Sequence, residues 1–84
     1  MPKIEIYCTK SCPYCRMAEA LLDHKGAEYT KIFIDGDPEG WAAMEQRSRR
    51  RTVPQIFIGE THVGGFDDLS ALNAAGKLDP LLQD

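Results

Sequence analysis

Hydrophobic and polar residues alternate at the start of the chain and then take up a helical spacing. Ile4 and Ile6 flank a polar residue, which predicts a strand over residues 3–7. The apolar residues that follow recur at the period of a helix, which predicts a helix over residues 13–25 that is closed by Gly26. The chain therefore begins with a strand and a helix joined by a short polar segment.

A second strand and a second helix follow. Alternating apolar residues predict a strand over residues 28–34. Asp37 and Pro38 then supply an N-cap and a first-turn proline for a helix that fades near residues 48–51. The buried stripe expected for this helix consists of Trp41, Met44 and Ala42.

The last part of the chain predicts a hairpin and a third helix. Gln55–Ile58 and Thr61–Gly64 are two short strands, and residues 59–60 between them suit a two-residue turn. A third helix is expected to end at Gly76, and a short helical turn is expected at residues 79–82.

The order of these elements, β–α–β–α–β–β–α, indicates an α/β fold. A short β–α–β crossover implies two parallel strands with a right-handed connection. The final hairpin adds antiparallel strands, so we expect a four-stranded mixed sheet with helices on both faces. The absence of repeats and linkers predicts one domain over residues 1–84.

Composition narrows the class of protein. The 84 residues are 43% hydrophobic and 27% charged, as in ordinary soluble globular proteins. A net charge of −3 gives no reason to expect nucleic-acid or membrane binding, and we expect no secretory signal because Met1-Pro2-Lys3 leads directly into a strand. Three cysteines within eight residues form no disulfide framework, so we expect a reducing compartment, the cytoplasm.

Cys12 and Cys15 carry the clearest chemical signal. They lie at a strand-to-helix turn, and this spacing in a β–α–β pattern is typical of a thiol–disulfide redox pair. A helix N-terminus presents unpaired N–H groups and partial positive charge, which stabilise a thiolate. We therefore expect Cys12, at the N-cap, to be the nucleophile and Cys15 to be the resolving thiol. Flanking Lys10 and Arg16 add positive potential.

Cys8 completes the spacing Cys-x₃-Cys-x₂-Cys, which also matches the iron–sulfur ligands of radical S-adenosylmethionine enzymes. Those enzymes need a large partial barrel, and 84 residues leave no room for one. We expect Cys8 to be a buried small hydrophobe, with an accessible third thiol as the alternative. His24 and His62 are expected on the surface without a ligand role, because their spacing from the cysteines does not suit zinc, and no metal is expected.

Thr52, Val53 and Pro54 form a second candidate segment. A proline at the entrance to a strand cannot donate to the ladder, and a tight turn there often carries a cis peptide bond. If this segment faces Cys12, the Val53 backbone can pair with an extended peptide that contains a cysteine. The alternative is a plain proline at a strand start, and these residues alone leave both interpretations open.

Gly64, Gly65, Asp67 and Asp68 form a third candidate segment, between a strand and a helix. Paired glycines allow close backbone approach, and the helix N-terminus presents amides to an anion. Asp67 or Asp68 would cap the helix or accept a hydrogen bond from a ligand ammonium group. Amides beside a carboxylate suit an α-amino acid end, and capping alone is the alternative.

Together these segments resemble a dithiol glutaredoxin, closest to the short bacterial glutaredoxin-3 type, over essentially the whole chain. Cys-Pro-Tyr-Cys at 12–15, Thr-Val-Pro at 52–54 and Gly-Gly-Phe-Asp-Asp at 64–68 occur in the family's order. The resemblance implies a thioredoxin-like fold, a cis proline at Pro54, and glutathione as electron donor and co-substrate. It implies that glutathione is held by Lys10, Tyr14, Thr52, Val53, Pro54, Gly65, Asp67 and Asp68.

The resemblance also implies an activity and its partners. The expected enzyme reduces protein disulfides and glutathione mixed disulfides through Cys12 and Cys15, as a monomer, with ribonucleotide reductase among its candidate substrates. Two positions depart from the family pattern. Phe66 stands where relatives often have a cysteine, and Cys8 stands where threonine is commoner.

Two rival functions share parts of this pattern. A ribonucleotide-reductase redoxin would draw electrons from thioredoxin reductase, and the Asp67-Asp68 pair argues against it. A [2Fe–2S] carrier would use Cys12 and glutathione as ligands in a bridged dimer, and Pro13 disfavours it by stiffening the turn.

The arginines at positions 47, 49, 50 and 51 form the one basic run of the sequence. Cations at a helix C-terminus complement its macrodipole, which predicts a solvated helix end. A share in steering anionic glutathione is the alternative.

Overall fold

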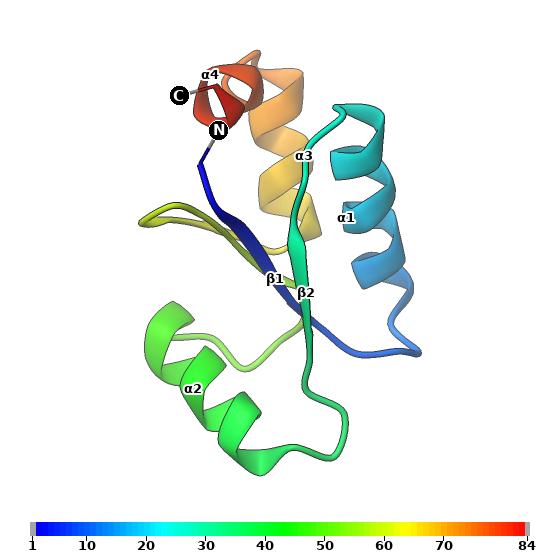
Figure 1. The fold of residues 1–84 in the computed structure, drawn as a ribbon, viewed down its shortest axis with the longest axis vertical. Helices are drawn as coiled ribbons and strands as arrows, with labels where there is room; N and C mark the ends of the chain where they lie inside the picture. The colour runs from blue at the N-terminus through cyan, green and yellow to red at the C-terminus, as the bar shows by residue number, and fades with distance from the viewer. Residues whose placement is uncertain (1, 84) are drawn as a thin grey trace.

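The computed structural model describes residues 2–83, which form a four-stranded sheet with helices on both faces (Figure 1). No helix in this part of the chain is long and apolar enough to cross a membrane. The expected order of strands and helices is confirmed, including the last helical turn. The elements are β1 (Ile4–Cys8), α1 (Pro13–His24), β2 (Thr30–Phe33), α2 (Pro38–Ser48), β3 (Gln55–Ile58), β4 (Thr61–Gly64), α3 (Phe66–Ala74) and α4 (Leu78–Leu82).

The sheet brings distant parts of the sequence to one end. Its strand order is β2-β1-β3-β4, with β1 parallel to β2 and antiparallel to β3. Tyr7 near the end of β1 pairs with Gln55 at the start of β3, and Ile56 pairs with Gly64 at the end of β4. The turn after β1, the segment before β3 and the start of α3 therefore meet at the same end of the sheet.

One face of the sheet packs against α1, α3 and α4. Ile4, Ile6 and Cys8 point to this face because successive side chains of a strand alternate between its two sides. Each is at most 1% exposed, and they pack with Ile56 and Ile58 of β3. The helices contribute Cys15, Ala18, Leu22, Leu69, Leu78 and Leu82 to this larger cluster.

α2 covers the opposite face (Figure 1). Its Met44 is fully buried against Tyr7, Ile34 and Phe57, and Trp41 is only half-buried at the edge of this smaller cluster rather than in the core. Ala42 is exposed, so its expected place in the buried stripe is wrong. Successive residues of a helix are rotated by about 100°, so a residue two positions from Met44 points away from the sheet.

Two strand boundaries differ from the expectation by a few residues. β1 extends to Cys8 because Cys8 pairs with Phe33 of the neighbouring strand. β2 is limited to Thr30–Phe33 because only this part of the expected strand lies in register with β1.

The start of α3 also differs from the expectation. Its N-cap is Gly65, in an extended conformation, and neither Asp67 nor Asp68 caps the helix. Asp68 lies at the third helical position, where its carboxylate accepts a hydrogen bond of 2.9 Å from the Gly65 N–H. This contact stabilises the first turn as the second half of a capping box does.

We expect Ile6→Ala to lower the free energy of unfolding by about 3 kcal/mol and Ile6→Val by about 1 kcal/mol. Ile6 is fully buried in the larger cluster, so each deleted methyl group loses apolar burial and leaves a cavity. Urea unfolding measures both changes. Ala43→Ser on the exposed face of α2 is the control, expected within about 0.5 kcal/mol of the unsubstituted protein. Equal losses for the two Ile6 variants would contradict the packing described here.

Candidate active site

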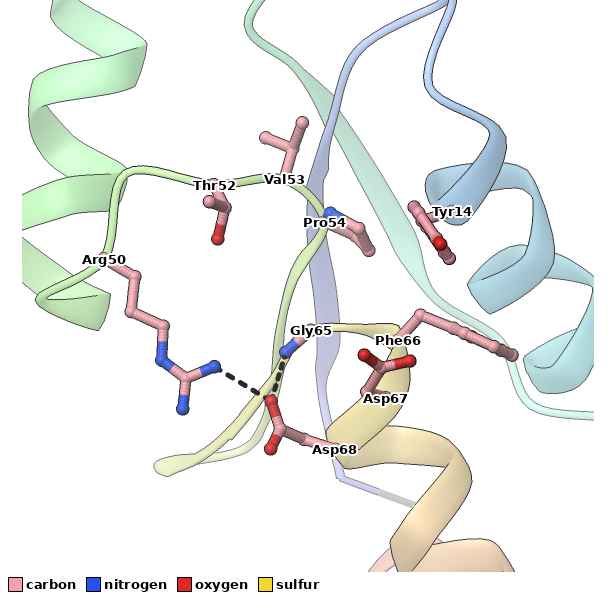
Figure 2. Close-up of a pocket in the computed structure, with 9 residues that line it drawn as sticks. All are labelled: Tyr14, Arg50, Thr52, Val53, Pro54, Gly65, Phe66, Asp67 and Asp68. Atoms are coloured by element: carbon pink, nitrogen blue, oxygen red, sulfur yellow. Dashed lines mark hydrogen bonds and ion pairs between the residues drawn. The ribbon is translucent and has the colours of Figure 1, made fainter.

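A pocket opens where the three segments meet at the end of the sheet. The first turn of α1 forms one wall, the chain before β3 forms the second, and the start of α3 forms the third (Figure 2). The pocket is lined by Tyr14, Arg50, Thr52, Val53, Pro54, Gly65, Phe66, Asp67 and Asp68.

Cys12 lies at the N-cap of α1, beside this pocket. Its backbone is extended (φ −93°, ψ 111°), and Pro13 occupies the first turn of the helix, where its missing N–H costs no hydrogen bond. The Cys15 N–H donates a hydrogen bond of 3.2 Å to the Cys12 sulfur. The Cys12 thiol in turn lies 3.8 Å from the Val53 carbonyl oxygen. The half-buried sulfur therefore sits between the helix N-terminus and the segment before β3.

The other two cysteines are fully buried thiols. Burial, followed by the hydrogen bond with Cys12, raises the pKa of Cys15 to about 12. Burial also raises the pKa of Cys8, and nearby Glu19 acts in the same direction. The Cys8 thiol points toward the Ile32 carbonyl at 3.9 Å, on the sheet side of α1. The environment therefore separates one accessible sulfur from two protected ones.

The Val53–Pro54 peptide bond is cis, as the resemblance to glutaredoxins implies. Pro54 is buried, whereas Thr52 is exposed at the pocket. The ladder between β1 and β3 begins at Gln55, so the Val53 backbone lies beyond the paired part of the strand. The Val53 carbonyl therefore faces the Cys12 sulfur instead of a neighbouring strand.

An ion pair joins the other two walls of the pocket. Arg50, from the chain after α2, donates to the Asp68 carboxylate at 2.8 Å, and Asp68 also accepts the Gly65 N–H (Figure 2). The Arg50 hydrogen bond and then the Gly65 hydrogen bond hold the pKa of Asp68 below its ordinary value. Gly64 has φ +114°, and a Cβ there would collide with the Asp68 carboxylate. A glycine is thus required both by the backbone and by the ion pair.

Seven of the eight residues expected to hold glutathione line this pocket, and Lys10 does not. The Lys10 backbone N–H donates to the Asp35 carboxylate at 3.1 Å, and the residue is exposed. Arg16 is also occupied elsewhere: its guanidinium contacts Glu19 at 2.6 Å and the Thr9 carbonyl at 3.2 Å. Both residues stabilise the turn before α1.

Two residues near the pocket, Arg50 and His62, were not expected there. Arg50 is one of four arginines between positions 47 and 51, and nothing in the sequence distinguishes it as the one that contacts α3. His62 was expected on the surface, but it is half-buried, stacked on Phe57 with 4.9 Å between ring centroids, and 2.8 Å from the Gln55 side chain. Burial and then the charge of Arg50 lower the pKa of His62. The predicted two-residue turn at 59–60 is the signal that could have placed His62 opposite Phe57, where the structure pairs them.

Within residues 2–83, no three His, Cys, Asp or Glu side chains are grouped as ligands for a metal ion.

Comparison with known proteins identifies the family. The glutaredoxin family model matches residues 4–63. The chain is 55% identical over 82 residues to a glutaredoxin of Pseudomonas aeruginosa, with 98% of both chains covered. It is 52% identical over 83 residues to glutaredoxin 3 of Escherichia coli K12, covering 99% of this chain and 100% of that protein.

A solved structure agrees with these sequence relatives. The crystal structure of a buckwheat glutaredoxin–glutathione complex superposes with a TM-score of 0.87 at 36% identity, covering 94% of this chain and 74% of that chain. This similarity confirms the thioredoxin-like α/β fold. A cysteine pair at a helix start, a cis proline opposite it and full-length similarity to these proteins lead to one conclusion: the chain belongs to the glutaredoxin family, and it is a thiol–disulfide oxidoreductase.

Proposed function

We propose that this protein reduces glutathione mixed disulfides and protein disulfides with glutathione as the electron donor, and that Cys12 is its nucleophile. The observation that carries the proposal is the position of the Cys12 sulfur. It accepts the Cys15 N–H at the start of α1 and faces the Val53 backbone at the edge of the pocket. A thiolate there is stabilised by the helix N-terminus and is accessible to a bound disulfide.

The proposed reaction begins on a glutathionylated protein. The Cys12 thiolate attacks the glutathione sulfur, a new disulfide forms between Cys12 and glutathione, and the protein thiolate leaves and takes a proton. A second glutathione thiolate then attacks the bound glutathione sulfur. This step releases oxidised glutathione and returns Cys12 to the thiolate.

A protein disulfide follows a second route. Cys12 attacks one of its sulfurs and forms a mixed disulfide with the protein. Cys15, after losing its proton, then attacks the Cys12 sulfur, which frees the reduced protein and leaves a Cys12–Cys15 disulfide. Two glutathione molecules reduce this disulfide and leave as oxidised glutathione. The high pKa of Cys15 keeps it a thiol until the mixed disulfide has formed, because burial opposes its ionisation.

The pocket offers groups that suit glutathione, an extended peptide with two carboxylates and one ammonium group. The Val53 backbone lies outside the β1–β3 ladder, which suits pairing with the central cysteine of glutathione as a short strand. The N-terminus of α3 suits a carboxylate, and the exposed Asp67 on its first turn suits the ammonium group. Tyr14, 57% exposed, forms the opposite side of the pocket.

We further propose that the protein works in the cytoplasm, where thiols are kept reduced. Three free cysteines in one small chain suit that compartment.

The roles of the two cysteines predict different losses of activity. We expect Cys12→Ser to abolish reduction of both a glutathionylated peptide and a protein disulfide. Cys15→Ser should keep reduction of the glutathionylated peptide and lose that of the protein disulfide, because only the second route needs the resolving thiol. An assay with glutathione, glutathione reductase and NADPH measures both. Equal losses for the two variants would refute the assignment.

Cys8→Ser is the control for a third thiol and is expected to leave turnover almost unchanged, since Cys8 is fully buried below α1.

Replacing glutathione and its reductase by thioredoxin reductase tests the electron donor: comparable turnover would contradict the glutathione proposal. A visible absorption spectrum after anaerobic reconstitution with iron and sulfide tests the [2Fe–2S] alternative.

The buried thiol also predicts a pH dependence of stability. An unfolded cysteine ionises near pH 9, whereas folded Cys15, with a pKa of about 12, keeps its proton. The unfolded state thus binds fewer protons between these values, and the free energy of unfolding should fall as pH rises, by up to about 1.4 kcal/mol per pH unit for this group. Urea unfolding from pH 8 to 11 measures the slope. A slope that is unchanged in Cys15→Ser would contradict this origin.

A further inference from the structure

We propose that Gln55 and His62 are positioning residues that hold Thr52 in the orientation in which it binds glutathione. The inference rests on the proposed function and adds two residues to it. A chain of hydrogen bonds runs from His62 on β4 through Gln55 on β3 to Thr52 at the pocket. We call this the His62–Gln55–Thr52 chain.

The chemistry of the acceptors fixes the proton positions in this chain. The Gln55 amide nitrogen lies 3.0 Å from the Thr52 carbonyl oxygen and 3.2 Å from its hydroxyl oxygen. A carbonyl oxygen only accepts, so the Gln55 atom facing it must be the NH₂ group. The Gln55 carbonyl oxygen then faces His62 Nε2 at 2.8 Å, and this nitrogen must carry the proton. The direction of donation is therefore His62 to Gln55 to Thr52.

The burial of Gln55 makes both of its side-chain contacts, with Thr52 and with His62, important for its position. Gln55 is fully buried, so water cannot replace a lost partner without rearrangement. A buried polar atom left without a hydrogen bond is unfavourable, and the Gln55 carbonyl oxygen has His62 as its side-chain donor. The side chain of Gln55 is held from both ends and cannot rotate without breaking one of the two contacts.

Ring stacking fixes the orientation of the His62 side chain. Its ring stacks on Phe57 at an interplanar angle of 28°, and the Arg47 guanidinium lies 3.9 Å from the centroid of the Phe57 ring. Arg47 is itself paired with Glu5 at 2.8 Å. The stack aligns the imidazole so that Nε2 points to Gln55.

Burial, more than the surrounding charges, favours the neutral form of His62. Burial lowers its pKa most, Arg50 and Arg47 act in the same direction, and Asp68 opposes them. A neutral imidazole has one N–H, and the geometry commits that N–H to Gln55. Because Nε2 keeps its proton when the ring is protonated, substitution rather than pH tests the chain.

The chain determines what Thr52 offers to a ligand. Both of its oxygen atoms receive hydrogen bonds from Gln55, so the hydroxyl hydrogen is left to donate toward the pocket. Thr52 is exposed there beside Val53. Removal of the His62 donor would thus free the Gln55 side chain and, through it, Thr52. We expect this change to weaken glutathione binding without altering the reacting sulfur atoms.

The test compares His62→Phe with His62→Gln. Phenylalanine keeps a ring on Phe57 and removes the donor, whereas the glutamine amide can donate from nearly the position of Nε2. With a glutathionylated peptide, we expect His62→Phe to raise KM about fivefold with kcat within about twofold, the signature of lost ground-state binding. We expect His62→Gln to restore KM to within about twofold of the unsubstituted protein.

Gln55→Met is a second variant of similar volume that keeps the test decisive if His62→Phe does not fold. It should raise KM at least as much, and adding His62→Phe to it should cause no further rise, because the chain is already broken. An unchanged KM in both single variants, a His62→Gln variant as poor as His62→Phe, or independent additive effects would overturn the inference. An unsubstituted protein without glutathione-linked turnover would refute the proposed function instead.

Discussion

The antiparallel pairing of β1 with β3 is the contact on which the site depends. β1 ends where β3 begins, with Tyr7 opposite Gln55, so the chain that leaves β1 lies beside the chain that enters β3. The first carries Cys12 and the second carries the cis Val53–Pro54 bond. Both strands are central in the sheet and are buried on both faces, which gives the two segments a rigid support. Cys12 and the Val53–Pro54 segment lie outside the strands, but the pairing of β1 with β3 sets their relative positions.

The site also shows how one helical turn gives two identical side chains different properties. Cys12 is half-buried and accepts a backbone N–H, whereas Cys15 is fully buried against the sheet. Burial disfavours the charged form of the inner thiol, whereas the outer sulfur lies at the helix N-terminus and accepts a backbone N–H there. In the proposed reaction, this difference sets the order of events: the accessible sulfur reacts first, and the protected sulfur reacts only when a disulfide is brought to it.

Much of this arrangement follows from short-range signals. The alternation of Ile4 and Ile6 predicts β1, and the two residues at 59–60 predict the hairpin turn, because strand periodicity and turn chemistry are local. The partner of Arg50 could not be predicted in the same way, since four arginines lie close together and only the packing of α3 shows which one reaches Asp68. His62 was missed for a related reason: its contacts with Gln55 and Phe57 cross between strands and are set by the register of the hairpin.

Gly64 shows that the two ends of the hairpin differ in their tolerance of change. The turn at Gly59 is open, with only Pro2 near the position of an added Cβ, at 3.9 Å. At Gly64 the space of a single methyl group is already taken by Asp68 and by Arg50, whose Nη1 would lie 3.0 Å away. The tip of the hairpin thus has space for a longer loop, although Gly59 itself has φ +60°, which residues with a side chain rarely adopt, while the base has no room for a side chain. At one end of this short hairpin the constraint on a side chain is backbone conformation alone, and at the other it is backbone conformation together with packing.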